Sequence, residues 1–331
     1  MDLSLKVAVP RLTWGSGRFI VTTRRYTINQ RMLTSNGTMS VNSPIALFAI
    51  ATLIWGSTWL AITFQLGVVE PEVSVVYRFA LAAVILFAWC AARGQRLRFQ
   101  RRTHAWLALQ GSTLFGLNYV GVYVAERYVA SGLVAVAFST LVFIVPISSR
   151  LAFGTPVPPR VALGAVIGVC GVASLFLPEL RAASVGGTAA LGVSFALGST
   201  VIAAIGNLVT VRLQSDKVPT LSGTAWGMSY GALTAAAIAW IGGSPWTFDW
   251  GFAYVSSLVY LSVFGSIVAF VTYFKLLKLV GANRASFTAV AIPVVAMALS
   301  TVFEGYRWTS TAAFGAALAF AGNYLALTAK R

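Results

Sequence analysis

The sequence predicts an all-α integral membrane protein with ten transmembrane helices, arranged as two inverted-topology repeats of five helices. Its composition is 58% hydrophobic and only 10% charged, which lies outside the range of soluble globular domains. About ten stretches of roughly 18–30 residues lack charged residues apart from one Arg, and each is long enough to cross a ~30 Å hydrocarbon core. The order of the charges and an internal repeat supply the rest of the prediction.

Positive charges fall almost entirely in alternate gaps between these stretches. Of the 24 Lys and Arg, 20 lie in the N-terminal arm, the C-terminus and the even-numbered gaps. The acids show the opposite order, and the odd-numbered gaps hold Glu70, Glu72, Glu126, Glu179, Asp249 and Glu304. Short loops rich in Lys and Arg stay on the cytoplasmic side of a membrane. We therefore expect an even number of spans in a bacterial inner membrane, with both termini in the cytoplasm.

The chain is expected to divide into a basic arm at 1–42, a first five-helix repeat at 43–180 and a second, inverted repeat at 184–329. The arm resembles a transit peptide, or a stretch upstream of the true start codon, because it is basic and rich in Ser and Thr. Met32 and Met39 are alternative starts. We expect the arm to be disordered or to lie on the cytoplasmic membrane surface.

The predicted spans, in chain order, are 45–69, 73–92, 105–125, 131–150, 160–178, 188–211, 219–241, 250–275, 284–303 and 308–328. Most of the loops between them are short; the exceptions are the basic gap 93–104 and the aromatic gap 242–249. Every span is predicted to be helical, since an isolated segment in lipid satisfies its backbone hydrogen bonds only as a helix.

Motif offsets relate the two halves of the chain. IWGSTW at 54–59 matches ALGSTV at 196–201, and the segment that begins at Pro71 matches the one that begins at Pro219. The Phe-Gly pair at 115–116 matches a second pair at 264–265. These landmarks, with matching glycines near the end of each half, drift by only nine residues, from an offset of 142 to 151. Such regular spacing indicates an internal duplication.

An odd number of spans per repeat places the second copy upside down relative to the first. Inverted-topology repeats are the architecture of secondary transporters, whose binding sites lie near the bilayer midplane between the repeats. Alternating access requires this symmetry, because exchanging the conformations of the halves converts an outward-open state into an inward-open one. The sequence therefore predicts a transporter.

The WGST motif in span 1, the Pro71–x6–Arg78–Phe79 entry to span 2 and the Ala130–Gly132 start of span 4 resemble one family. They are similar to the EamA-type exporters of the drug/metabolite transporter superfamily, and the resemblance covers residues 45–328. The resemblance implies that the repeat unit has five helices. Among better-known members, the chain is most similar to bacterial aromatic amino acid exporters. The chain departs from the pattern after span 4, where Gly154 is followed by Thr155 instead of Glu.

Candidate solute-binding residues are polar or aromatic side chains within the spans. Trp55 and Trp59 share one face of span 1, where packing beside Gly56 is the alternative role. Interhelical hydrogen bonding is the alternative for the polar and hydroxyl-bearing candidates. The candidates are Trp55, Trp59, Asn118, Tyr119, Tyr123, Ser139, Asn207, Tyr260 and Arg78.

Arg78 is the one cation inside a predicted span. It could neutralise an anionic group such as an amino acid carboxylate. We favour the structural alternative, in which the side chain extends outward to the membrane surface or pairs with an acid of an outer loop.

Small-residue stripes in spans 5 and 10 predict close helix packing at Gly164, Gly168 and Gly171, and at Gly315 and Gly322. Their symmetry suggests that the two spans pack on each other, with homodimerisation as the alternative. Pro146 and Pro293 lie inside spans 4 and 9, where each should kink its helix. A gating hinge and a static kink are both compatible with these prolines.

The sequence predicts export of small neutral or zwitterionic metabolites, with aromatic amino acids the best single choice. No carboxylate is expected at mid-membrane, which argues against cationic drugs and against a buried proton relay, so we expect facilitated diffusion or weak coupling. A quaternary-cation or multidrug exporter is the first rival. A membrane enzyme or a scaffold is the second rival, and we expect neither of these two. An enzyme is not expected because His104 is the one histidine in the chain.

The expected partners are a small-molecule solute and membrane lipid. We expect no cofactor, no metal and no nucleic acid, because the positive charges are those of cytoplasmic loops and the two cysteines form no metal signature. A monomer and a homodimer are both compatible with the sequence.

Overall fold

The computed structural model describes residues 5–15, 18–28, 43–154, 156–183, 188–285 and 287–328. They fall into two units, Met1–Ser43 and Pro44–Arg331. The first unit contains two strands and the second consists of helices.

Strands β1 (Leu5–Gly15) and β2 (Arg18–Ile28) form an antiparallel hairpin in which Leu5 pairs with Ile28 and Gly15 with Arg18. The arm, which the sequence predicted to be disordered or to lie on the membrane surface, thus contains two strands among its described residues. Val and Thr occur in both strands, with Trp in β1 and Ile, Phe and Tyr in β2, and these residues favour the extended backbone. The other residues of the arm, 1–4, 16–17 and 29–42, lie outside the described residues.

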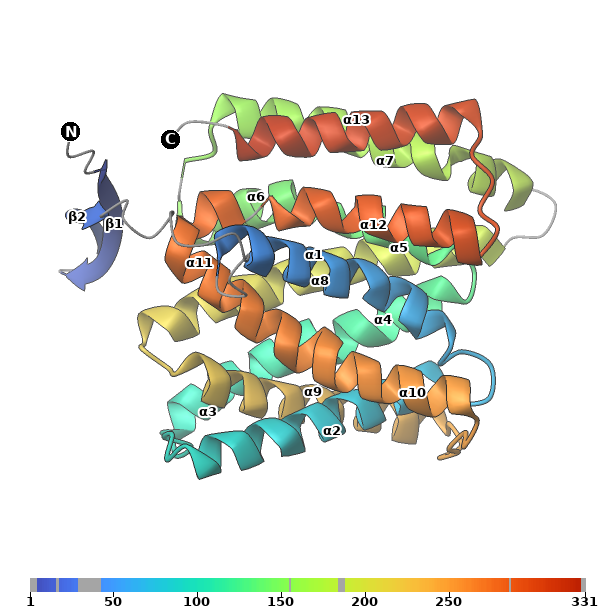
Figure 1. The fold of residues 1–331 in the computed structure, drawn as a ribbon, viewed down its shortest axis with the longest axis horizontal. Coiled ribbons are helices and arrows are strands. Elements are labelled where there is room, and N and C mark those ends of the chain that lie inside the picture. Colours follow the sequence, from blue (N-terminus) through green and yellow to red (C-terminus); the bar gives the residue numbers. More distant parts are fainter. Residues whose placement is uncertain are drawn as a thin grey trace, which may run out of the picture. The chain divides into compact units, whose positions relative to one another are not determined.

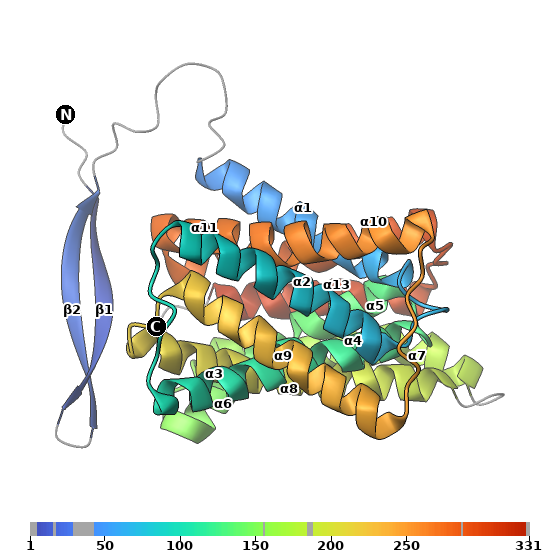
Figure 2. The same ribbon diagram turned by 90° about the horizontal axis from the view of Figure 1, so that it is seen from below.

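The second unit is a bundle of helical runs with short connections (Figures 1 and 2). Its elements are α1 (Pro44–Thr63), α2 (Pro71–Ala92), α3 (Arg101–Gln110), η2 (Gly111–Leu117), α4 (Asn118–Glu126), α5 (Ser131–Ser139), α6 (Leu141–Phe153), α7 (Pro159–Ala183), α8 (Thr188–Ser215), α9 (Thr220–Gly242), α10 (Phe252–Tyr260), η3 (Leu261–Val268), α11 (Ala269–Ala285), α12 (Thr288–Phe303) and α13 (Ser310–Leu327).

Within the described residues, seven helical runs are long and apolar enough to cross a membrane. They are Pro44–Thr63, Pro71–Ala92, Ser131–Ser148, Pro159–Pro178, Thr188–Ser215, Phe252–Tyr273 and Ser310–Leu327. The other three predicted spans are also helical. The run α3–η2–α4 begins with a polar turn, α9 is rich in Gly and Ser, and α12 has 16 residues.

Local sequence determines where several helices begin and end. Pro71 is the first residue of α2, where its missing N–H costs nothing. Gly154 and Gly243 follow α6 and α9 with φ of 69° and 67°, a left-handed conformation that favours glycine. The Thr309 side chain caps α13 by accepting a hydrogen bond from the backbone N–H of Ala312 at 3.1 Å.

The bundle has two chemically different ends, which Figure 1 shows at left and right. The basic end is the one at which the α2–α3 loop (93–100) and the α8–α9 loop (216–219) lie. The acidic end is the one at which residues 64–70, 127–130, 243–251 and 304–309 lie. An ion pair between Arg127 and Glu70 at 2.7 Å connects two of the loops at the acidic end.

Two π-helical segments, η2 and η3, interrupt otherwise continuous helical runs at matching places in the two halves. Each contains one copy of the Phe-Gly pair, at 115–116 and 264–265. A π-helical turn is rare and is often found at a functional site, because it alters which carbonyl groups are free. Here the carbonyl of Gly265, within η3, accepts a hydrogen bond from Trp55 Nε1 at 3.2 Å.

Helix contacts follow the same two-fold pattern. Helix α1 packs on α11 and α12, and α8 packs on α3, α5 and α6. Helix α9 packs on η2 as α2 packs on η3, while α2 contacts α9 and α7 contacts α13. Thus almost every helix contacts partners from the other half of the chain.

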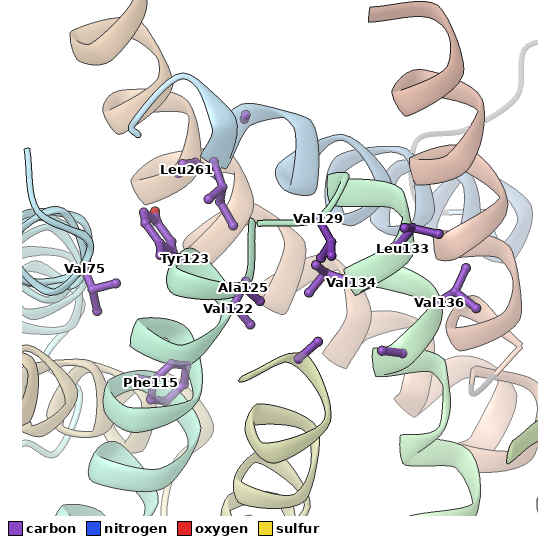
Figure 3. Packing of buried hydrophobic residues seen from close by; sticks show 14 of the residues in the cluster. Val75, Phe115, Val122, Tyr123, Ala125, Val129, Leu133, Val134, Val136 and Leu261 are labelled. Atoms are coloured by element: carbon purple, nitrogen blue, oxygen red, sulfur yellow. The ribbon is translucent and has the colours of Figure 1, made fainter. Parts of the chain in front are cut away.

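The main hydrophobic core runs through the middle of the bundle toward the acidic end. Figure 3 shows part of it, where Val122 and Ala125 of α4 lie near Val129 and Val134. Tyr123 also lies in this core and is fully buried. The residues of the core near the acidic end therefore lie in a tightly packed, apolar environment.

Candidate functional site

A cavity of about 330 Å³ lies between α1, α3, η2, α4, α5, α6, α8, α9, α11 and α12. Its wall contains no charged side chain among the residues that the structure describes. Its aromatic residues are Trp55, Trp59, Phe115, Tyr119, Phe138, Phe270 and Tyr273, and its amide side chains are Gln110, Asn118, Asn207 and Gln214. Ligand pockets commonly hold about 300–1,000 Å³, so this cavity is suited to small solutes.

The cavity reaches toward one end of the bundle only. Gln214, Val218, Pro219 and Thr220 line it, and they lie at or beside the α8–α9 loop of the basic end. No residue from the described loops of the acidic end is part of the wall. The structure therefore represents a state in which the acidic end is closed.

Trp55 holds one side of the cavity in place through contacts with η3 and α11. Its Nε1 donates to the carbonyl of Gly265, and its ring lies 5.2 Å from the ring of Phe270, edge to face. The ring of Tyr273 lies 5.3 Å away, also measured between centroids. Trp55 thus lines the cavity, while the adjacent Gly56 allows α1 to approach Val295 of α12.

Trp59 lies one helical turn further along α1 and also lines the cavity. Its ring centroid is 5.2 Å from that of Phe138 on α5. Ser139, the next residue, is part of the wall, but its Oγ donates to the carbonyl of Val136 at 2.7 Å. The wall at this level is therefore aromatic, with the serine hydroxyl occupied by its own helix.

Two amides of the cavity wall each have a buried oxygen without a hydrogen-bond partner among the described residues. Asn118 is 4% exposed; its Nδ2 donates to the carbonyl of Leu114 at 3.0 Å, and its Oδ1 has no hydrogen-bond partner among the described residues. Gln110 donates from Nε2 to Thr210 Oγ1 at 2.7 Å, and its Oε1 is likewise unpaired within the described part of the chain. A buried acceptor without a donor is costly, and both oxygens are fully buried in the wall, so a solute N–H group could reach them only after the two side chains turn toward the cavity. Asn207 also lines the wall, and its Nδ2 donates to the carbonyl of Ala203.

Three predicted solute-binding residues lie outside the cavity wall. Tyr260 shares a 2.6 Å hydrogen bond with Ser57 Oγ. Tyr123 donates from its hydroxyl to Gln65 Oε1 at 2.8 Å, nearer the acidic end. Arg78 is 1% exposed and lies behind the ring of Tyr119.

Neither structural role favoured for Arg78 is found. The side chain does not extend to the surface, and within the described residues it forms no ion pair. Its Nε donates to Ser266 Oγ at 3.3 Å and its Nη1 donates to Tyr123 Oη at 3.4 Å. The guanidinium carbon lies 4.6 Å from the ring centroid of Tyr119, whose ring lines the cavity. Arg78 therefore joins α2, η3 and α4 directly behind the cavity wall.

Sequence reasoning missed Gln110, Gln65 and Glu126. Gln110 and Gln65 are amides in or beside predicted spans, so their polarity was a usable signal. Glu126 was assigned to an outer loop by the charge order, but it is the last residue of α4 and is 7% exposed. Its burial is not evident from the charge order, which places Glu126 in an outer loop.

The small-residue stripes meet within the chain. A Cβ atom added to Gly164 would lie 2.6 Å from the carbonyl oxygen of Gly322, and one added to Gly171 would lie 2.7 Å from that of Gly315. Gly168 faces the ring of Phe143 and also contacts α13 at Gly322. Helices α7 and α13 are thus in backbone contact along this seam.

Pro146 lies inside α6 and Pro293 inside α12, where Pro293 lines the cavity. If these prolines form a gating hinge, replacing both by alanine restores two helical hydrogen bonds and should slow transport severalfold while raising helix stability. Transport rates of Pro146→Ala, Pro293→Ala and the double variant in liposomes check this. Unchanged rates in all three would leave a static kink as the role of these residues.

Comparison with known proteins gives a consistent result. Residues 42–177 and 190–328 match the sequence model of the EamA-like transporter family. The chain is 25% identical to the uncharacterized transporter YoaV of Bacillus subtilis, over 74% of this chain and 83% of that protein. It is 29% identical to the uncharacterized inner membrane transporter YedA of Escherichia coli K12, over 78% of this chain and 82% of that protein. A solved crystal structure with 20% sequence identity has the same fold, with a TM-score of 0.61 over 88% of this chain and all of its own.

Proposed function

Since the chain belongs to the EamA-like transporter family, a family of multi-pass membrane proteins, we propose that it exports small neutral or zwitterionic metabolites, with aromatic amino acids as the best single solute class. The observation that carries this proposal is the uncharged, aromatic wall of the cavity. A solute with a net charge would have to shed its hydration without gaining a counter-charge there. A zwitterion or neutral molecule with an aromatic ring fits the wall better.

The wall offers both parts of such a solute a partner. The rings of Trp55, Trp59 and Phe138 suit an aromatic side chain, since offset and edge-to-face ring contacts add to the burial of apolar area. The unpaired oxygens of Asn118 and Gln110 are buried in the wall, and once the side chains turn toward the cavity they would suit an ammonium group, which has donors and no acceptors.

The proposed mechanism is alternating access between two inverted repeats of five spans each. The two segments that match the family, the paired π-helical segments and the reciprocal helix contacts all support a duplicated architecture. The charge order supports an inverted arrangement, with both termini and the basic end in the cytoplasm of a bacterial cell. In that orientation the cavity would face the cytoplasm, ready to load a solute for export.

Export of quaternary cations is the second candidate, and the density of aromatic rings around the cavity favours it. Aromatic faces attract cations without a formal negative charge. A quaternary ammonium ion offers no N–H group, so it would leave the oxygens of Asn118 and Gln110 unsatisfied. We therefore rank it below the aromatic amino acids.

Transport by the purified protein in liposomes tests the proposal. Radiolabelled Phe or Trp should enter protein-containing vesicles faster than empty ones, and Trp55→Ala should lower uptake about tenfold or more, equivalent to ~1.4 kcal/mol of lost binding. Trp240→Ala is the matched control, because Trp240 is 79% exposed and outside the cavity wall. Uptake no greater than in empty vesicles would refute the solute class, and uptake of quaternary cations alone would establish the second candidate.

A further inference from the structure

Glu126 is a buried acid without a partner. It ends α4, is 7% exposed, and neither of its carboxyl oxygens has a hydrogen-bond partner among the described residues. The next residue along the chain, Arg127, does not pair with Glu126. It forms an ion pair with the surface residue Glu70 at 2.7 Å. Consecutive residues on a helix point about 100° apart, so one side chain faces the bundle and the other faces solvent.

Two charged groups act on the carboxyl group of Glu126, namely Glu304 and Arg78. Glu304 follows α12 and accepts two hydrogen bonds from Ser131, one from the backbone N–H at 3.2 Å and one from Oγ at 2.5 Å. Arg78 is occupied by Tyr123 and Ser266. Glu126 thus interacts electrostatically with a half-buried acid that is bonded to Ser131 and with a guanidinium group that is bonded elsewhere.

The other helices around α4 add few titratable groups. Helices α1 and α5 contain none, and α8 contains only Arg212, in its last turn at the basic end. On α4 itself the titratable groups besides Glu126 are Tyr119 and Tyr123. On α2 the charged groups are Arg78 and Glu72, and Glu72 lies in the first turn, where it accepts a hydrogen bond from Ser244 Oγ. The electrostatic environment of Glu126 is therefore set mainly by Glu304 and Arg78.

An ionised carboxylate at this position would be unstable. It would be removed from water, would gain no donor, and would be repelled by Glu304. When two nearby carboxyl groups cannot both be ionised, the proton stays on the one with fewer donors, and that one is Glu126. With the acidic end closed, Glu126 is therefore held as the neutral acid.

We propose that Glu126 is a proton-binding site of this transporter, which holds a proton while the acidic end is closed and releases it to water when that end opens. The inference deepens the proposed function, on which its transport consequences rest. The closed state binds the proton and the open state does not, so acid on that side favours closure and alkali favours opening. Solute export would consequently depend on the pH outside the cell.

Arg78 gives the proton site a route to the cavity. Arg78 is the cation that interacts with Glu126, so an ionised Glu126 would attract it. An ion pair between the two would draw the guanidinium away from Tyr123 or Ser266. Because the same guanidinium lies against the ring of Tyr119, any such shift would alter the cavity wall. Proton release at the acidic end and solute binding would then be linked through one side chain.

The first test measures the proton directly. Infrared spectra of the full-length protein in lipid nanodiscs at neutral pH should contain a protonated-carboxyl C=O band that Glu126→Gln removes. Glu70→Gln should keep the band, since Glu70 is a solvent-accessible acid at the same end, paired with Arg127. A spectrum without this band, or a band that survives in Glu126→Gln, would overturn the proposal.

Carbodiimide labelling of the unmodified protein avoids any doubt about whether a variant folds. Carbodiimides react with protonated carboxyl groups in apolar surroundings, so mass spectrometry should find the label on Glu126 and not on Glu70. Label on Glu70 or Glu304 with none on Glu126 would contradict the assignment.

The second test measures transport in liposomes while the pH is varied on the side of the acidic end. The wild-type rate should change with pH, whereas Glu126→Gln should behave at every pH like the wild type in acid, and Glu70→Gln like the wild type throughout. A wild-type rate independent of pH would overturn the link between proton and transport. If no aromatic amino acid is moved at any pH, the proposed solute fails, and the infrared and labelling results still decide the proton site.

Discussion

Replacing Gly171 by alanine should destabilise the protein by about 1–3 kcal/mol, the usual cost of adding atoms to a fully packed core. The added methyl group would meet the backbone of α13, including the carbonyl oxygen of Gly315 at 2.7 Å. Backbone atoms cannot move aside as a flexible side chain can, so the two helices would have to separate along their seam. Thermal unfolding in detergent, followed by circular dichroism, measures the loss.

Gly198→Ala is the matched control for Gly171→Ala. Gly198 lies in α8, and a Cβ atom added to it meets nothing within 4 Å. Since alanine is a better helix former than glycine, this variant should be neutral or slightly stabilised. Equal unfolding temperatures for the two variants would show that the α7–α13 contact is looser than the structure indicates.

Replacing Arg78 by methionine should reduce transport about tenfold or more, a loss of at least ~1.4 kcal/mol, while leaving the protein folded. The guanidinium is the group that supports Tyr119 from behind, and methionine cannot do so. Stability should hold, because replacing a buried charge by an apolar side chain of similar size is often neutral. Tyr123 and Ser266 each retain another hydrogen bond, to Gln65 and to the carbonyl of Leu261.

Arg78→Lys tests whether transport needs only the positive charge of Arg78 or also the geometry of its guanidinium group. Lysine keeps the positive charge but cannot donate to Ser266 and Tyr123 in the planar fork of a guanidinium, so transport should remain low. Arg127→Met controls for the loss of an arginine at the same end, because Arg127 belongs to a surface pair worth little. Uptake assays paired with unfolding temperatures distinguish the outcomes, and wild-type uptake by Arg78→Met would exclude this role.

The helical membrane architecture could be predicted from sequence because hydropathy and charge order are one-dimensional signals. The same is true of the cavity-lining tryptophans, since Trp55 and Trp59 are four residues apart and must share a helix face. Tyr119 and Tyr123 share a face in the same way, yet only Tyr119 reaches the cavity. The closure of the acidic end separates them, and spacing along a helix contains no information about where a cavity stops.

Glu126 shows a second limit of what the sequence alone can predict. Charge order places it and Arg127 in the same loop, although one is buried and the other is on the surface. Helix α4 extends through Glu126, and the direction of each side chain follows from that rotation. No pattern of charges distinguishes two adjacent residues that a helix turns to opposite surroundings.

The seam between α7 and α13 has a consequence for how such a chain could be assembled. Each half of the sequence ends in a helix whose glycine face packs mainly against the final helix of the other half. A polypeptide made of the first half alone would expose most of that face to lipid, with backbone atoms unpacked. It could recover the lost contacts by associating with another half, so we expect a single half to be stable only as a dimer.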